Sequence, residues 1–204
     1  SVNNGTVYAA GKEVSGLPDK NVVWYAKWNV NKYILTVNPN GGTWNDSTET
    51  KTFEQAYATT KSISNPTRVG YTFDGWNDGN TDNPRTITIG DNTSVKPIYK
   101  PNTNTKYVVN HYKQNVTLDG YDLADTDNLT GTTGATVTPS VRNYEGFISP
   151  DPVEATIKAD GTTVLNYNYN RKTYEFVIED TEDVISSKPS GNYPYGTEIE
   201  LEAK

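Results

Sequence analysis

The feature that most constrains the fold is an internal repeat, which predicts a series of small units in place of one large core. Three times along the chain, a strand-like segment rich in aromatic residues precedes a short polar stretch and then a tyrosine that opens the next strand-like segment. The opening residues are Tyr33, Tyr107 and Tyr174, which recur at intervals of about 70 residues. A glycine followed by an aromatic residue lies in the second half of two intervals, at Gly70 and Gly146. A shared order of features at a shared spacing indicates repeated structural units.

The repeat divides the 204 residues into two complete and two partial units. The predicted units are the C-terminal half of a preceding repeat at 1–32, complete repeats at 33–100 and 101–173, and the N-terminal part of a following repeat at 174–204. A unit of this size buries only about 60% of its unfolded surface, so neighbouring repeats of the same chain should supply part of its stability. The joining stretches at 29–32 and 101–106 are short and polar and lack glycine, which predicts limited bending. Because the pattern stops within a unit at both ends, we expect a segment of a longer protein.

Residue types and their alternation predict a mainly β fold of the α+β class. Short runs rich in Thr, Val, Ile and Tyr are separated by Asn, Gly, Asp and Pro, which is typical of strands and turns. In residues 164–170, Leu165, Tyr167 and Tyr169 share one face and three asparagines the other, as in a half-buried antiparallel strand. One or two helical turns are predicted around residues 52–58. Further strands are predicted at residues 22–28, 33–37, 85–89, 95–100, 107–112, 135–141, 174–178 and 198–201.

Charge and composition exclude several classes of function. The chain has 18 Lys and Arg against 25 Asp and Glu, a formal net charge of −7, so we expect no basic patch and no nucleic-acid partner. The absence of cysteine removes disulfides, cysteine-ligated zinc, iron–sulfur clusters and thiol nucleophiles. No apolar run approaches the roughly 18 residues that a membrane span needs, so no membrane insertion of this segment is expected.

The sequence predicts no enzyme, and therefore no catalytic residues, no cofactor and no metal. His111 is the single histidine, and although a Ser–His–Asp arrangement stays open, no G-x-S-x-G elbow would place the serine. His111 alternates with Tyr107 and Val109, so we interpret it as a packed or exposed strand histidine. The acidic stretches at 77–82 and 119–127 lack the spacing and the closing Glu of an EF-hand, and we interpret them as turns.

A motif in the first complete unit predicts how its aromatic residues pack. Residues 65–76 read NPTRVGYTFDGW. Tyr71 and Phe73 are two residues apart and so share one face of a strand. Gly75 can take a β-bulge or a positive φ, which lets Trp76 turn back to the same core. The residues that we predict to form the structural core motif of the two units are Gly70, Tyr71, Phe73, Gly75, Trp76, Tyr99, Phe147, Tyr167 and Tyr169.

The first complete unit resembles the internalin-type B repeat of bacterial surface proteins, whose pattern reads N-G-G near the start and P-x-R-x-G-Y-x-F-x-G-W in the middle. The N-G-G element corresponds to NPNGGT at residues 38–43, which reads as a hairpin turn. Residues 1–32, which contain VWYAKW at 23–28, resemble the tail of the same repeat, and residues 174–204 resemble a divergent copy. The second unit, with LTGTTG at 129–134 followed by Gly-Phe at 146–147, is similar to mucin-binding-protein-type repeats and lacks the Gly-Trp pair.

The resemblance implies small β-grasp-like modules in an elongated tandem array, within an adhesin on the cell wall of a Gram-positive bacterium. It implies an extracellular, semi-rigid stalk or spacer with weak contact to a host surface. The alternative is a dedicated module that binds a host cell-surface protein or glycan through exposed aromatic residues. Burial of Tyr71, Phe73, Trp76, Tyr167 and Tyr169 would favour the spacer, whereas coplanar, solvent-exposed tyrosines would favour binding.

Overall fold

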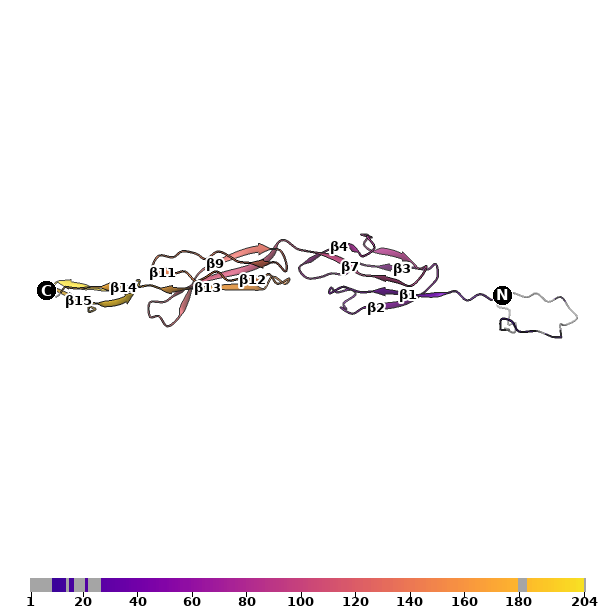
Figure 1. The fold of residues 1–204 in the computed structure, drawn as a ribbon, viewed down its shortest axis with the longest axis horizontal. Coiled ribbons are helices and arrows are strands. Elements are labelled where there is room, and N and C mark those ends of the chain that lie inside the picture. Colours follow the sequence, from indigo (N-terminus) through magenta and orange to yellow (C-terminus); the bar gives the residue numbers. More distant parts are fainter. Residues whose placement is uncertain (1–8, 14, 17–20, 22–26, 180–182, 204) are drawn as a thin grey trace.

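The computed structural model describes residues 9–13, 15–16, 21, 27–179 and 183–203, and these residues form β-strands and no helix. The fold is therefore mainly β as predicted, but the predicted α+β class is wrong for the described residues, which contain no helix. Figure 1 shows three groups of strands, in residues 32–101, 105–171 and 173–203, following one another in chain order along the longest axis of the molecule, while the paired strands within a group lie side by side. The strand predicted at residues 22–28 lies outside the described residues except for Lys27 and Trp28, and Trp28 is 87% exposed.

Residues 32–101 form three small sheets around one core. Their strands are β1 (Lys32–Val37), β2 (Lys51–Ala56), β3 (Thr60–Ile63), β4 (Tyr71–Trp76), β5 (Arg85–Thr88), β6 (Thr93–Val95) and β7 (Pro97–Pro101). β1 pairs antiparallel with β2 on one side and parallel with β6 on the other, while β3 pairs with β5 and β4 with β7, both antiparallel. All three sheets contribute to one interior, which contains Leu35, Val37, Trp44, Ile63, Trp76, Ile87, Ile89 and Val95.

Residues 105–171 surround a second core, which shares no residue with the first. Their strands are β8 (Thr105–Gln114), β9 (Tyr121–Gly131), β10 (Thr136–Val137), β11 (Phe147–Ile148), β12 (Ala155–Thr156) and β13 (Thr163–Arg171). One sheet has the order β11-β13-β8-β9, with β13 and β8 parallel and the outer pairs antiparallel, and β10 pairs with β12 in a second small sheet. The core consists of Tyr107, Val109, Phe147, Ile157, Leu165, Tyr167 and Tyr169.

The last described residues form two two-stranded sheets, each made of strands that are not consecutive in the chain. Their strands are β14 (Thr173–Phe176), β15 (Val184–Ser186), β16 (Gly191–Pro194) and β17 (Leu201–Ala203). β14 pairs with β16 and β15 with β17, both antiparallel. Tyr195, which follows β16, packs against the core of residues 105–171. The predicted boundary after residue 173 is therefore crossed by an aromatic contact.

Several local predictions were confirmed and others were wrong. The strands predicted at residues 33–37, 85–89, 107–112, 164–170 and 174–178 correspond to β1, β5, β8, β13 and β14. The helix predicted around residues 52–58 is instead β2, because its pairing with all of β1 outweighs local helix propensity. The strand predicted at 135–141 is limited to β10, since Pro139 has no N–H for a ladder. The segment at 164–170 pairs parallel with β8 and antiparallel with β11. Its residue pattern predicted antiparallel pairing, whereas the β-grasp-like modules that the resemblance implies would place the first and last strands side by side and parallel.

Two further strand predictions needed adjustment. The segment predicted at 95–100 is divided between β6 and β7, because the chain leaves one sheet at Val95 and enters another at Pro97. The strand predicted at 198–201 lies further along the chain, as β17. The first error concerns where the chain changes from one sheet to another, and the second concerns where a strand begins. Alternation within a single segment encodes neither.

Candidate functional site

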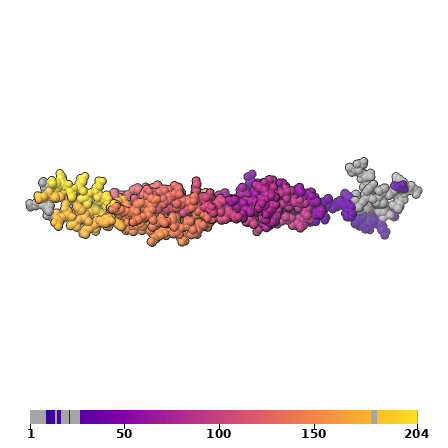
Figure 2. All heavy atoms as spheres, turned by 90° about the horizontal axis from the view of Figure 1, so that it is seen from above, coloured from indigo at the N-terminus to yellow at the C-terminus, as the bar shows by residue number. Residues whose placement is uncertain are grey.

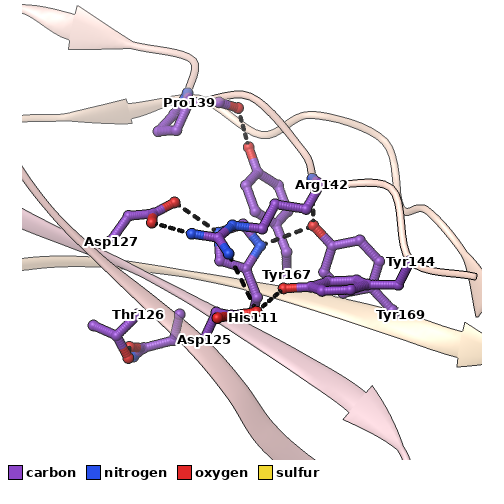
Figure 3. A network of polar contacts seen from close by, with 10 residues as sticks. His111, Asp125, Thr126, Asp127, Pro139, Arg142, Tyr144, Tyr167 and Tyr169 are labelled. Carbon is purple, nitrogen blue, oxygen red and sulfur yellow. Dashed lines mark hydrogen bonds and ion pairs between the residues drawn. The ribbon is translucent and has the colours of Figure 1, made fainter.

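A network of polar side chains lies on the inner face of the four-stranded sheet (Figure 3). We call it the His111 network; its members are His111 of β8, Asp125 and Asp127 of β9, Tyr169 of β13, and Arg142 and Tyr144 from the segment between β10 and β11. Strand alternation places His111 on the same face as Tyr107 and Val109, and its side chain is fully buried. The packed strand histidine is thereby confirmed.

Hydrogen bonds select one tautomer of His111. The backbone N–H of Arg142 donates to the hydroxyl oxygen of Tyr169 at 2.7 Å. The hydroxyl proton of Tyr169 is then free to be donated to Nδ1 of His111, 2.8 Å away. The Nε2 atom of His111 carries the ring proton and donates it to Oδ2 of Asp127 at 3.1 Å. In this form both ring nitrogens of the buried histidine have partners.

The charged half of the network connects two carboxylates through one guanidinium group. Nη1 of Arg142 lies 3.2 Å from Oδ2 of Asp125, and Nη2 of Arg142 donates to Oδ1 of Asp127. The hydroxyl of Tyr144 donates to Oδ2 of Asp125 at 2.5 Å. Nζ of Lys113 lies 3.9 Å from the centre of the Tyr144 ring, so a cation also faces this aromatic side chain.

These contacts shift the pKa of each group in a direction that follows from its partners. The hydrogen bond from Tyr144 lowers the pKa of Asp125, and the hydrogen bond from Arg142 lowers the pKa of Asp127. Burial, followed by the bond to Asp125, raises the pKa of Tyr144 to about 12. Burial also raises the pKa of Tyr169. Each shift favours the protonation state that the network uses.

The geometry of the network suits the linking of neighbouring strands better than catalysis. The order Tyr–His–Asp is that of a nucleophile with a general base, but His111 and Tyr169 have no exposed surface. A substrate therefore has no path to the Tyr169 hydroxyl, which already contacts Arg142 and His111. Among the described residues, no group of three or more His, Cys, Asp or Glu side chains is placed to hold a metal ion.

The outer face of the same sheet has a different chemistry. We call it the Asn/Tyr face; its members are uncharged and come from three adjacent strands: Val108, Asn110 and Tyr112 of β8, Tyr121, Leu123, Thr126 and Asn128 of β9, and Val164, Asn166, Asn168 and Asn170 of β13. Hydrogen bonds cross the strands from Thr126 to Asn110 at 3.0 Å and from Asn110 to Asn166 at 3.2 Å. The hydroxyl of Tyr121 donates to Asn170 at 2.5 Å. These members thus form an ordered surface rich in amides, and the charged residue Lys106 lies on the same face at the start of β8.

The residues predicted as the structural core motif lie in two interiors. Trp76 belongs to the first core, and Phe147, Tyr167 and Tyr169 belong to the second; all four are buried. The remaining aromatic members are half-buried: Tyr71, Phe73 and Tyr99. The structure therefore does not bring the motif residues together at one site.

Around Gly75 the local backbone follows the prediction. The β4–β7 register shifts between Phe73 and Gly75, and Gly75 has a φ of 124°, so the predicted bulge is confirmed. Phe73 and Trp76 then meet edge to face with ring centres 5.7 Å apart. Beside them, the Arg68 guanidinium covers the Tyr71 ring at 4.2 Å from its centre.

Sequence reasoning missed most of the His111 network. The interpretation of residues 119–127 as a turn was wrong from Tyr121 onward, because β9 begins there. The turn itself is held by Asp119, which accepts hydrogen bonds from the side chains of Asn115 and Thr117. The available signal was the alternation of Asp125 and Asp127, which places two carboxylates on one strand face. The other acidic stretch is a turn as predicted, in which Asp78 accepts two hydrogen bonds from Arg85, at 2.9 and 2.6 Å.

Comparison with known proteins adds no family to this description. No protein-family model matches the chain, and no curated protein matches it significantly. The described residues contain no helix long and apolar enough to span a membrane.

Proposed function

We propose that the chain is a non-enzymatic repeat region of a bacterial cell-surface adhesin, which acts as a semi-rigid extracellular stalk of β-grasp-like modules in tandem. Two separate cores support a division into small units. The succession of these units along the longest axis in Figures 1 and 2 supports an elongated array. The B-repeat and mucin-binding-type motifs support the surface location. The proposal assigns the aromatic motif to packing within units and to no ligand.

The observation that carries the proposal is the parallel pairing of the first and last strands of residues 105–171. Tyr107–Lys113 of β8 lies in register with Thr163–Tyr169 of β13, over seven consecutive positions. The chain enters this region at the start of β8 and leaves it at the end of β13, so tension acts at opposite ends of the pair. All the inter-strand hydrogen bonds are then sheared together, whereas loading both strands at one end would break them in turn.

Direction-dependent unfolding under force tests the load-bearing role. Because the chain has no cysteine, pulling handles can be attached at introduced cysteines. In the variant Lys106→Cys/Lys172→Cys the load shears β8 against β13, and in Lys106→Cys/Thr162→Cys it peels them apart from one end. We expect a clearly higher unfolding force for the first variant. Equal forces, or unfolding at negligible load in both variants, would contradict the stalk function.

The Asn/Tyr face favours a second candidate function, the binding of a neutral glycan. Amide groups donate and accept hydrogen bonds, as sugar hydroxyls do, and Tyr112 and Tyr121 offer aromatic edges on the same face. The members of the Asn/Tyr face carry no charge, so they themselves give no attraction to anionic polymers. A glycan array with wild-type protein and Asn168→Asp tests this function, with Glu154→Gln as a control away from the face. Binding that the N168D variant alone loses supports a glycan site, and absence of wild-type binding excludes it.

A further inference from the structure

The two glycine–aromatic steps occupy equivalent places in the fold. Tyr71, which follows Gly70, pairs with Pro101, the last residue of β7. Phe147, which follows Gly146, pairs with Arg171, the last residue of β13. Each step therefore lies beside the point where the chain leaves one region and enters the next. The sequence repeat alone did not indicate this shared position at the exit.

One residue directly after each exit strand makes the same pair of backbone hydrogen bonds. The N–H of Asn102 donates to the carbonyl of Gly70 at 2.9 Å, and the carbonyl of Asn102 accepts from the N–H of Thr133 at 2.9 Å. In the second case the N–H of Lys172 donates to the carbonyl of Gly146 at 2.8 Å, and its carbonyl accepts from Tyr195 at 2.8 Å. The linker residue thus connects a glycine turn of one region to the following region.

The segments that accept these connections are also alike. Thr133 precedes Gly134 in a turn closed by a bond from the N–H of Ala135 to the carbonyl of Thr132 at 3.0 Å. Tyr195 precedes Gly196 in a turn closed by a bond from the N–H of Thr197 to the carbonyl of Pro194, also at 3.0 Å. Two different sequences thus form the same pattern of backbone hydrogen bonds.

At both joints the following region approaches the glycine too closely for a side chain. A Cβ on Gly70 would lie 2.6 Å from the carbonyl oxygen of Ala159 and 2.8 Å from its Cα. A Cβ on Gly146 would lie 2.0 Å from Cδ1 of Tyr195. Both glycines have a positive φ, of 75° and 78°, which already disfavours other residues. Ordinary carbon contacts begin near 3.5 Å, so any side chain would displace the neighbouring region.

We infer that each glycine–aromatic step is a docking site for the next unit of the same chain, and that its glycine permits the contact which restricts bending. This inference deepens the proposed stalk function and rests on it for the identity of the partner as a following repeat. The first joint receives the backbone around Ala159, and the second receives the ring of Tyr195, which also meets Phe147 at 6.2 Å between ring centres. The two joints thus share the same backbone hydrogen bonds but differ in the group that packs against the glycine.

The first test compares Gly70→Ala with Gly79→Ala in the full chain. Gly79 also has a positive φ, of 82°, but nothing lies within 4 Å of a Cβ placed there, so it controls for backbone strain alone. Backbone residual dipolar couplings of residues 33–100 and 105–171 should fit one alignment tensor in the wild type and in G79A. In G70A we expect two tensors. A wild type that needs two tensors, or a G70A variant that fits one, would overturn the inference.

The second test uses the ring of Tyr195 to rescue a blocked joint. We expect Gly146→Ala alone to speed hydrogen exchange of the Lys172 and Tyr195 amides by about tenfold or more, as in local opening. The double variant Gly146→Ala/Tyr195→Ala removes the ring that the new Cβ meets. In the Tyr195→Ala background, adding G146A should therefore have only a small effect on the exchange rates of the amides near residue 146. The effect should be no larger than the effect of G79A on the amides near residue 79. If the effects of the two substitutions on the exchange rates were additive, the proposed contact between Gly146 and Tyr195 would be contradicted.

These outcomes are independent of the outcome for the stalk. Tensors and exchange rates report whether neighbouring regions are fixed to one another, whereas the pulling experiment reports whether one region resists load. A fixed joint with no shear resistance would leave the docking inference standing and remove the load-bearing function. A mobile joint with strong shear resistance would overturn the docking inference and leave the load-bearing function standing.

Discussion

Residues 32–101 and 105–171 share an arrangement of strands but differ in the residues that form their cores. In both regions the first strand pairs in parallel with a late strand, but over three positions for β1 and β6 and over seven for β8 and β13. The first interior is aliphatic and tryptophan-rich, with the Arg85–Asp78 pair at its edge, whereas the second is tyrosine-rich and contains the His111 network. The two regions therefore share the order in which their strands pair more than the composition of their cores.

The largest expected effect separates the two interiors. Trp76 is fully buried and touches only the first core, so Trp76→Ala should destabilise residues 32–101 by about 3–5 kcal/mol. For a small unit this approaches its whole stability. Amide NMR spectra should then show loss of dispersed signals from this region and retention of those from 105–171. Simultaneous loss of the dispersed signals from both regions would show that they unfold as one cooperative unit and would contradict their division into two.

A hydroxyl deletion should affect the second region alone. Tyr169→Phe preserves the ring but leaves the N–H of Arg142 and Nδ1 of His111 without their shared partner. Leaving a buried polar group unpaired costs about 1–3 kcal/mol, which urea unfolding monitored by NMR would detect. Tyr112→Phe, on the Asn/Tyr face, is the matched control and should be nearly neutral. Equal effects of Y169F and Y112F would show that the network contributes little to stability.

Acid should lower the stability of the second region more than that of the first. Hydrogen bonds from Tyr144 and Arg142 lower the pKa of Asp125 and Asp127, and a hydrogen bond from Arg85 lowers that of Asp78. A carboxyl with a lowered folded pKa adds stability above its unfolded value of about 3.9, and this stability is lost as the pH falls through the folded value.

Two further carboxyls in exposed turns of the second region act in the same sense, because side-chain hydrogen bonds from threonines lower the pKa of Asp119 and Asp160. We therefore expect urea midpoints measured between pH 5 and pH 2 to fall more steeply for residues 105–171. Replacing Arg142 by Met should remove the part of the difference that comes from Asp127 and a smaller part that comes from Asp125. A steeper fall for residues 32–101 would reverse the assignment of the charged network.

The smallest effect lies at alkaline pH. The pKa of Tyr144 is raised to about 12, first by burial and then by its bond to Asp125. The neutral phenol therefore adds stability that is complete below its unfolded pKa of about 10 and is lost as the pH rises through about 12. The ¹³Cζ shift of Tyr144 should titrate near 12 in the folded chain. Titration near 10 would contradict the placement of Tyr144 against Asp125.

Local patterns predicted those parts of the fold that are encoded locally. The alternation of tyrosine and asparagine predicted β13, and the glycine before Trp76 predicted a bulge, because side-chain period and backbone freedom are properties of single segments. Strand β9 was missed since its inner face carries Asp125 and Asp127 while the apolar Leu123 lies on its outer face, so no hydrophobic alternation marks it. Its partner Arg142 lies outside any strand, and no spacing in the sequence connects the two.

The parallel pairing and the joints depend on distant residues and are therefore invisible to such patterns. β8 meets β13 only after the intervening residues have folded back, and Gly146 meets Tyr195 across the predicted boundary at residue 173. The repeat predicted that neighbouring units contact one another but not through which atoms.

End-to-end pulling of the wild-type chain tests most directly whether the two regions, each with its own core, bear load one after the other. In each region the load would act on a pair of parallel strands, β1 with β6 over three positions and β8 with β13 over seven. We expect two unfolding events, each releasing about 230–250 Å of chain for a unit of about 70 residues. The event at lower force should disappear in Trp76→Ala, which assigns it to residues 32–101. A single event that releases the whole chain, or a weaker event assigned to residues 105–171, would contradict the account.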